Sequence, residues 1–200
     1  MARTSNILIP KFRFSEPVRN LPNHPTGCGG EDRLALRFAQ AYAASLAESG
    51  DGTRTHTALA RQIPVTGYGI ADIVAVTWDR PSRAGPPVTL SSVAFSSPAK
   101  PVICAFEVKL RDWRKALMQA SRYRFFAHVA AVVMPEDACG AALKFLDTFH
   151  LLKVGLWTFD AKSRRITTHF TPLPAPPRDM RRAMNAMSRV ARITRALPIS

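Results

Sequence analysis

The sequence predicts an α/β domain, in which a central sheet is covered by helices, and two kinds of segment lead to this prediction. Short apolar runs, with the length and composition of strands buried on both faces, recur along the chain. Around them lie longer segments whose apolar residues repeat at helical spacing. The chain has 200 residues, which is enough for one domain with a hydrophobic core and leaves little room for two.

The first part of the chain predicts an irregular arm, a helix and two strands. Residues 1–30 are rich in proline and glycine and show no regular period, so we expect an irregular N-terminal arm. From residue 31 to 49 apolar residues recur every four positions and a glycine follows, which predicts an amphipathic helix. A short strand is expected at 62–66, and the apolar run 69–78 predicts a strand buried on both faces.

A proline- and serine-rich segment separates this strand from the next. We expect residues 80–100 to form a long hairpin loop that includes a strand around 88–95. A strand at 102–110 follows, and then a basic amphipathic helix at 111–126. Trp113 lies on the apolar stripe of that helix, so it is expected in the core rather than as a platform for base stacking.

The last part of the chain alternates strands and helices before a proline-rich break at 172–177. The final helix carries six arginines and a single acid, Asp179. In order, we expect a buried strand at 129–134, a helix at 136–149 with Leu143 and Leu146 facing inward, a core strand at 154–159, an edge strand at 165–170 and a helix at 178–195.

The charge of the chain predicts a polyanionic partner. There are 28 Lys and Arg residues against 14 Asp and Glu, a net charge of +14. Nucleic acid is the leading candidate because cations that neutralise phosphates release counterions, and no apolar stretch has the roughly 18 to 20 residues of a membrane span. The alternative to phosphate binding, for each basic residue, is that it lies on a helix face exposed to solvent. The final helix could also bind an acidic protein instead of nucleic acid. The candidate nucleic-acid contacts are Arg111, Arg114, Lys115, Arg122, Arg181, Arg182, Arg189 and Arg192.

Cysteine usage and the N-terminus predict a cytoplasmic protein. The three cysteines are widely separated and odd in number, which argues against a disulfide framework and fits a reducing compartment. The first residues lack the apolar run and cleavage site of a secretory signal.

Two acids interrupt apolar strands, where a carboxylate is costly unless it has a partner. Asp72 lies within the run 69–78, and Glu107 lies two positions before Lys109, on the same face of its strand. If the two strands are neighbours, two carboxylates and an ammonium converge, a set that suits Mg²⁺ with Mn²⁺ as a substitute. The alternatives are a surface pair on an edge strand for Glu107 and Lys109, and a buried cap or structural ion pair for Asp72.

The order of elements and acids between residues 31 and 160 resembles the PD-(D/E)XK nuclease superfamily, which includes restriction endonucleases, Holliday-junction resolvases and RecB-type nucleases. The resemblance implies a restriction endonuclease-like three-layer core, in the order αβββαβ, with a mixed central sheet between helices. The nuclease-like domain would then span residues 31–170, followed by a basic C-terminal helix and tail at 178–200.

The resemblance also assigns roles to residues. It implies that Asp72 and Glu107 are metal ligands and that Lys109 is the catalytic lysine. Many members carry a Gln and a Tyr on the helix after the lysine strand, and Gln119 and Tyr123 match them, four positions apart and therefore on one helix face.

The chain departs from the family pattern at some positions, and one residue of the pattern is not assigned. Some members have a further acid on the first helix, for which Glu31 and Glu48 are both candidates. Ala71 stands where the motif's name has proline, and Asp72 and Glu107 are 35 positions apart, so the hairpin between them is longer than in compact members.

The expected function is therefore a Mg²⁺-dependent nuclease that hydrolyses DNA phosphodiester bonds. The metal would polarise the scissile phosphate and activate a water, while Lys109 orients that water or stabilises developing charge. The alternatives are a catalytically inactive module that keeps the nuclease fold and binds nucleic acid, and a basic RNA-binding accessory protein. Because many members cut two strands as dimers, a homodimer is also open.

Overall fold

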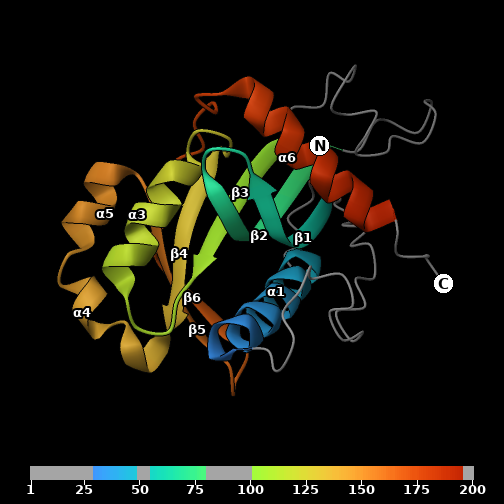
Figure 1. The fold of residues 1–200 in the computed structure, drawn as a ribbon. Helices are drawn as coiled ribbons and strands as arrows, with labels where there is room; N and C mark the ends of the chain where they lie inside the picture. The colour runs from blue at the N-terminus through green and yellow to red at the C-terminus, as the bar shows by residue number, and fades with distance from the viewer. Residues whose placement is uncertain (1–28, 49–54, 80–100, 196–200) are drawn as a thin grey trace, which may run out of the picture.

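A six-stranded mixed sheet forms the centre of the molecule (Figure 1). The structure is a computed structural model, and it describes residues 29–48, 55–79 and 101–195. The strand order is β1-β2-β3-β4-β5-β6; β3–β4 and β4–β5 are parallel, and the other neighbours are antiparallel. The strands are β1 Thr55–Val65, β2 Gly69–Asp79, β3 Val102–Val108, β4 Val129–Pro135, β5 Gly155–Asp160 and β6 Arg165–Phe170.

Helices cover both faces of the sheet, so the α/β class is confirmed. One helix packs on one face and the others on the opposite face, as the two separate buried clusters show. The helices are α1 Gly30–Glu48, α3 Trp113–Tyr123, the short 3₁₀ helix η1 Glu136–Ala138, α4 Gly140–Leu143, α5 Leu146–Leu152 and α6 Met180–Arg195. None of the helices in these ranges has the length and apolar character needed to cross a membrane.

Helix α1 forms as its apolar spacing predicts. Phe38 is fully buried, and its ring meets those of Phe106 and Phe159 edge to face, with centroids 5.3 and 5.7 Å apart. These contacts fix α1 across β3 and β5. Glu31 and Asp32 lie in the first turn, where the helix dipole favours negative charge. Packing through Phe38 therefore holds two carboxylates at one end of the sheet.

Helices α3 and α6 cover the other face. Asp112 caps α3, because its carboxylate accepts the backbone N–H of Lys115 at 3.0 Å. Trp113 is buried, which confirms its expected place in the core. The apolar stripe of α6 packs mainly on β1, and it consists of Ala183, Ala186, Met187, Val190 and Ala191. Outside this stripe, Arg181 and Arg192 are exposed.

Two sequence-based predictions of secondary structure are wrong in part. The single helix expected at 136–149 is broken into η1, α4 and α5, and Leu143 is 37 % exposed rather than inward. The break occurs at Phe145, which leaves helical conformation and packs its ring 4.9 Å from that of Trp113. The strand expected at 62–66 is longer and begins at residue 55. The predictions for residues 1–28 and the strand around 88–95 lie outside the described residues.

Candidate metal and catalytic site

Strands β2 and β3 bring the two conspicuous acids together. The strands are antiparallel, with Ile73 opposite Phe106, so the same register continued by one residue sets Asp72 opposite Glu107. Strand β3 is the third of six, and Glu107 is only 1 % exposed. The alternative of a surface pair on an edge strand is therefore wrong.

Glu107 is a buried carboxylate with two side-chain partners. The Tyr123 hydroxyl bonds to its Oε2, and the ammonium of Lys109 lies 3.2 Å from its Oε1. Burial raises the pKa of Glu107, and the charge of Asp72 adds to the rise, against the bonds from Tyr123 and Lys109. The resulting pKa is about 7. Glu107 therefore exchanges its proton near neutral pH.

Asp72 is oriented by two donors on different strands. Its Oδ2 accepts the backbone N–H of Val108 at 2.8 Å, and its Oδ1 accepts the side-chain amide of Gln62 at 3.3 Å. Burial raises the pKa of Asp72, while the Val108 bond and the charge of Lys109 act in the opposite direction. The carboxylate is thus fixed from β1 and β3 although it belongs to β2.

Lys109 links the sheet to α1. Its Nζ lies 3.0 Å from Oε2 of Glu31, in addition to its contact with Glu107. Burial acts to lower the pKa of Lys109, but the bonds and charges of Glu31 and Glu107 outweigh it and leave the pKa raised. Lys109 therefore stays cationic at neutral pH. Of the two acids open for α1, Glu31 is the one at this site, because Glu48 is the last residue of the same long helix.

Tyr123 lies in the site and Gln119 lies beside it. Both project from α3, and the Tyr123 hydroxyl is buried against Glu107 and 2.8 Å from the carbonyl oxygen of Ile70. Gln119 is half-buried, and its Oε1 is buried without a hydrogen-bond partner in the part of the chain that the structure describes. An unpaired buried amide oxygen is unusual, and it leaves Gln119 able to accept a bond from a ligand.

Gln62 is a site residue that sequence reasoning missed. It is inside β1 but has a φ of 52°, in the left-handed region, and the β1–β2 register has no pair at this position. Its amide donates to Asp72 and lies 3.5 Å from Oδ1 of Asp32, which also makes an ion pair with Arg61 at 3.6 Å. Backbone strain of this kind is often retained at functional sites. The only sequence signal is a polar pair, Arg61 and Gln62, between apolar residues.

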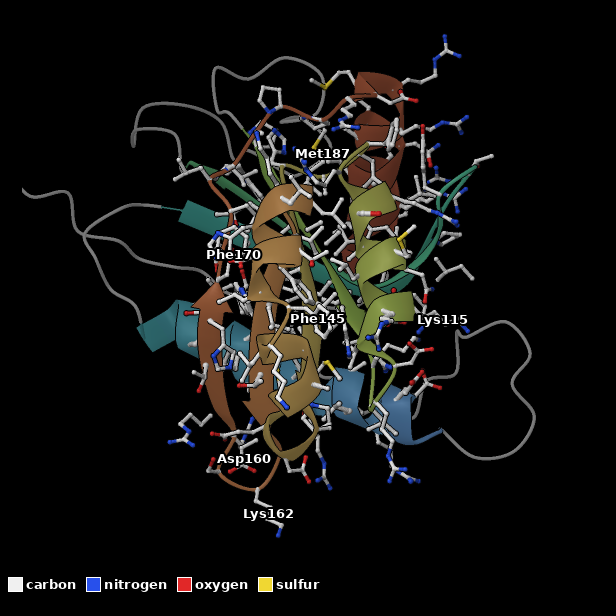
Figure 2. The ribbon with its side chains drawn as sticks, turned by 90° about the vertical axis from the view of Figure 1, so that its left-hand side faces the viewer. Lys115, Phe145, Asp160, Lys162, Phe170 and Met187 are labelled. Atoms are coloured by element: carbon white, nitrogen blue, oxygen red, sulfur yellow. The ribbon has the colours of Figure 1, made fainter. Side chains whose placement is uncertain are left out.

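The predicted nucleic-acid contacts lie on two exposed surfaces. The four basic residues in or just before α3 are exposed, and Figure 2 labels one of them, Lys115, on this helix. The guanidinium of Arg114 lies over the ring of Trp113, 4.4 Å from its centroid. On α6, Arg181 and Arg192 are exposed, while Arg182 and Arg189 are half-buried and bond to Asp179 and Asn185. These partners belong to α6 and the residues just before it, and not to the group of Asp72, Glu107 and Lys109.

The donor set fits a divalent cation only in part. No group of three or more His, Cys, Asp or Glu side chains is placed to hold a metal among residues 29–48, 55–79 and 101–195. Mg²⁺, however, is commonly held by one or two protein carboxylates and keeps several waters. Asp72 and Glu107 meet that requirement, and Glu31 adds a third negative charge against the single ammonium of Lys109.

No known protein family model matches the chain, and no similar sequence is found among curated proteins. The function is therefore inferred from the chemistry of the residues themselves.

Proposed function

We propose that the chain is a Mg²⁺-dependent deoxyribonuclease with a restriction endonuclease-like core of the PD-(D/E)XK type, which hydrolyses DNA phosphodiester bonds. The observation that supports this most is the convergence of Asp72, Glu107 and Lys109 inside the sheet, with Glu107 buried. Evolution of a stable core does not require two carboxylates at such a place, because apolar residues of similar size would serve as well.

The cation would be held by Asp72 and Glu107, and Mn²⁺ would be accepted in place of Mg²⁺. Each of these carboxylates has a raised pKa, and the charge of Asp72 contributes to the rise at Glu107, so a divalent cation would relieve a repulsion that exists without it. When bound, the metal supplies polarisation of the scissile phosphate and a lowered pKa for a coordinated water.

Lys109 has the role of a fixed positive charge in this proposal. Its raised pKa keeps it protonated, so it does not serve as a general base at neutral pH. Contacts at 3.0 and 3.2 Å hold its ammonium between Glu31 and Glu107, which positions it to stabilise negative charge that develops on the phosphate. Because these contacts exist before substrate binds, little reorganisation is needed in the transition state.

Other residues hold the acids in place. The Val108 backbone N–H and the Gln62 amide orient the two oxygens of Asp72, and the Tyr123 hydroxyl orients Glu107. Arg111, Arg114, Lys115 and Arg122 are exposed around α3, where they would bind backbone phosphates on either side of the bond to be cut.

The experiment is a cleavage assay with single-stranded, duplex and branched DNA, in Mg²⁺, Mn²⁺ or EDTA. Wild-type protein is expected to cut at least one form with either metal and none in EDTA. Asp72→Asn and Lys109→Gln are expected to abolish cleavage and to retain DNA binding. Glu136→Gln, which alters an exposed acid paired with Arg165, is the matched control. Absence of cleavage in every metal and DNA form, or full activity of Lys109→Gln, would refute the proposal.

A second candidate function is a non-catalytic DNA-binding module. It is favoured by one observation: the ion pairs of Lys109 with Glu31 and Glu107 satisfy these side chains without a metal. Such a protein would bind DNA equally in EDTA and in Mg²⁺ and would cut none. The cleavage assay therefore separates the two candidates.

A further inference from the structure

Three elements that are distant in sequence meet at one corner beside the candidate site. The ring of Tyr68, in the turn between β1 and β2, stacks on that of Phe125, just after α3, with centroids 4.7 Å apart and planes 19° apart. The guanidinium of Arg178, just before α6, lies 5.4 Å from the Phe125 centroid. We call these three residues the aromatic–arginine corner. In Figure 1 the turn, the end of α3 and the start of α6 lie together near the top.

The corner is tied directly to the candidate site. Tyr123 lies two residues before Phe125, and its hydroxyl contacts both Glu107 and the carbonyl oxygen of Ile70. Ile70 in turn lies two residues after Tyr68 and is 52 % exposed. Two residues span at most about 7 Å of chain, so the corner lies next to the residues that surround Glu107.

Two arginines, Arg124 and Arg178, lie close together at the corner. Burial lowers the pKa of Arg124, and the nearby charge of Arg178 lowers it further. No ion pair within the described ranges involves Arg124 or Arg178, although Nη1 of Arg124 donates to the carbonyl oxygen of Leu152 at 3.2 Å. The nearest acid in sequence is Asp179. Its carboxylate already accepts the backbone N–H of Arg182 and pairs with the Arg182 guanidinium. An anion at the corner would relieve the repulsion between the two guanidinium groups.

The rings of the corner stay partly exposed, although Tyr68 also packs against the core. The backbone N–H of Asp179 donates to the carbonyl oxygen of Phe125 at 2.7 Å, so the start of α6 is already fixed to the end of α3 without the rings. Both Tyr68 and Phe125 remain half-exposed, and Arg178 is exposed. Aromatic rings next to basic side chains are the combination with which proteins bind single nucleic-acid strands.

We propose that the aromatic–arginine corner binds one unstacked nucleotide of a single DNA strand, whose base extends the Tyr68–Phe125 stack by packing on the Tyr68 ring and whose phosphate contacts Arg178 and Arg124. The inference rests on the proposed nuclease function for the direction of the strand, which would continue from the corner toward Asp72 and Glu107. It gives that function a substrate class, namely single-stranded DNA or DNA with an unpaired segment beside the cut.

The test measures DNA binding in EDTA, so that no cleavage is required. Fluorescence anisotropy compares a labelled 20-nucleotide single strand with a blunt duplex of the same length, for wild type, Tyr68→Leu and Tyr68→Phe. Because stacking contributes about 1–3 kcal/mol per base, Tyr68→Leu should weaken single-strand binding about fivefold or more. Tyr68→Phe keeps the ring and should bind like wild type, and duplex binding should change less than about twofold in both variants.

A second variant tests the phosphate contact. Arg178→Gln should weaken single-strand binding and reduce the slope of log affinity against log salt concentration by about 0.7, the value for one phosphate contact on a single strand. Arg165→Gln is the matched control, because this exposed arginine lies on β6, at the opposite edge of the sheet from β1, and pairs with Glu136. It should leave the salt slope unchanged.

A third measurement needs no variant and covers the case in which Tyr68→Leu does not fold. Single strands that carry 2-aminopurine at successive positions should show fluorescence quenching at one position when wild-type protein binds, because the base stacks on an aromatic ring. Uniform fluorescence at all positions, unchanged single-strand affinity of folded Tyr68→Leu, or an equal loss on duplex would each overturn the inference. If the protein cleaves DNA but shows none of these binding effects, the proposed nuclease function stands and the nucleotide site at the corner is rejected. If it shows the binding effects but does not cleave DNA, the nucleotide site stands and the proposed nuclease function is rejected.

Discussion

The hydroxyl of Tyr123 bonds to the buried carboxyl of Glu107, and the same oxygen lies 2.8 Å from the carbonyl oxygen of Ile70. A phenol has one proton to donate, and a carbonyl oxygen only accepts. The two acceptors therefore compete for one proton, and the bond to Glu107 favours the ionised carboxylate. Burial outweighs this bond and raises the pKa of Glu107 to about 7.

The first prediction is that the metal-free protein loses stability as pH rises. The folded-state pKa of Glu107, about 7, is above its ordinary value of 4.5, so between these pH values the native state binds more protons than the unfolded state. The contribution is present below about pH 4.5 and is lost through about pH 7, with an upper magnitude of about 3 kcal/mol. Urea unfolding in EDTA at several pH values measures it, and Glu107→Gln should flatten the profile relative to Glu136→Gln.

Removal of the Tyr123 hydroxyl should shift the pH dependence upward. The bond from Tyr123 lowers the pKa of Glu107, so Tyr123→Phe should raise that pKa and move metal-induced stabilisation to higher pH. Thermal unfolding with and without Mn²⁺ across pH measures the shift. Tyr42→Phe, which alters a tyrosine packed against Phe38 on the α1 face, should leave the profile where it is. Identical profiles for the two variants would exclude this role of Tyr123.

The variant Gln62→Gly should show whether Gln62 serves metal binding, because it removes the side-chain amide and tolerates the same backbone conformation. Glycine adopts a φ of 52° without a side-chain penalty, so stability should stay level or rise by about 1 kcal/mol. Without the amide, Asp72 loses a donor, and Mn²⁺ affinity should fall about tenfold, as is typical when a partner of a ligand is removed.

The matched control for Gln62 is Lys153→Gly, at a residue that also has a φ of 52° but follows α5. This variant should gain similar stability without any change in Mn²⁺ affinity, measured by titration with electron paramagnetic resonance. Unaltered Mn²⁺ affinity of Gln62→Gly would show that Gln62 serves the fold alone.

Glu31→Gln should reduce cleavage, whereas Glu48→Gln should not. Glu31 holds the ammonium of Lys109 at 3.0 Å and helps to raise its pKa. Its neutralisation should therefore lower kcat about tenfold through looser placement of Lys109, with little loss of DNA binding. Glu48, at the other end of α1, is the natural comparison. Equal rates for both variants and wild type would remove Glu31 from the mechanism.

Gly155→Ala should destabilise the sheet. A Cβ at this residue would lie 2.9 Å from Cβ of Ala131 and 3.1 Å from the carbonyl oxygen of Phe170, so β5 has no room for it between β4 and β6. The expected loss is about 1–3 kcal/mol in urea unfolding. Gly140→Ala, where nothing lies within 4 Å, should instead be neutral or slightly stabilising, because α4 begins there. A stable Gly155→Ala would show that β4 and β6 move apart easily.

Strands and helices with strong periodic patterns were predictable from the sequence. The buried runs that became β2, β4 and β5 are apolar on both faces, and α1 and α6 have regular apolar stripes. The segment 136–149 was not predictable in the same way. Its apolar residues fit the spacing of a helix. The ring of Phe145, however, packs against that of Trp113, and this contact between residues distant in sequence accompanies the break in the helix.

Within the candidate site, the sequence identified the acids and the lysine but not what holds them. Asp72 and Glu107 stand out because carboxylates are rare in apolar strands, and alternation puts Glu107 and Lys109 on one face. Gln62 and Asp32 gave no such signal, since an uncharged polar residue in a strand and an acid at a helix start are ordinary. Their role depends on a local left-handed backbone and on the docking of α1 against β1.

By itself the sequence determined the α/β class, the identity of the conspicuous charged residues and the large excess of positive charge. These follow from local patterns, because side-chain periodicity and the cost of a buried charge act on short segments. Tertiary structure alone decided that Asp72 faces Glu107, that Glu31 rather than Glu48 reaches Lys109, and that Tyr68, Phe125 and Arg178 form one corner. Each of these contacts joins segments far apart in the chain, and only the packing of helices on a sheet of defined register brings such segments together.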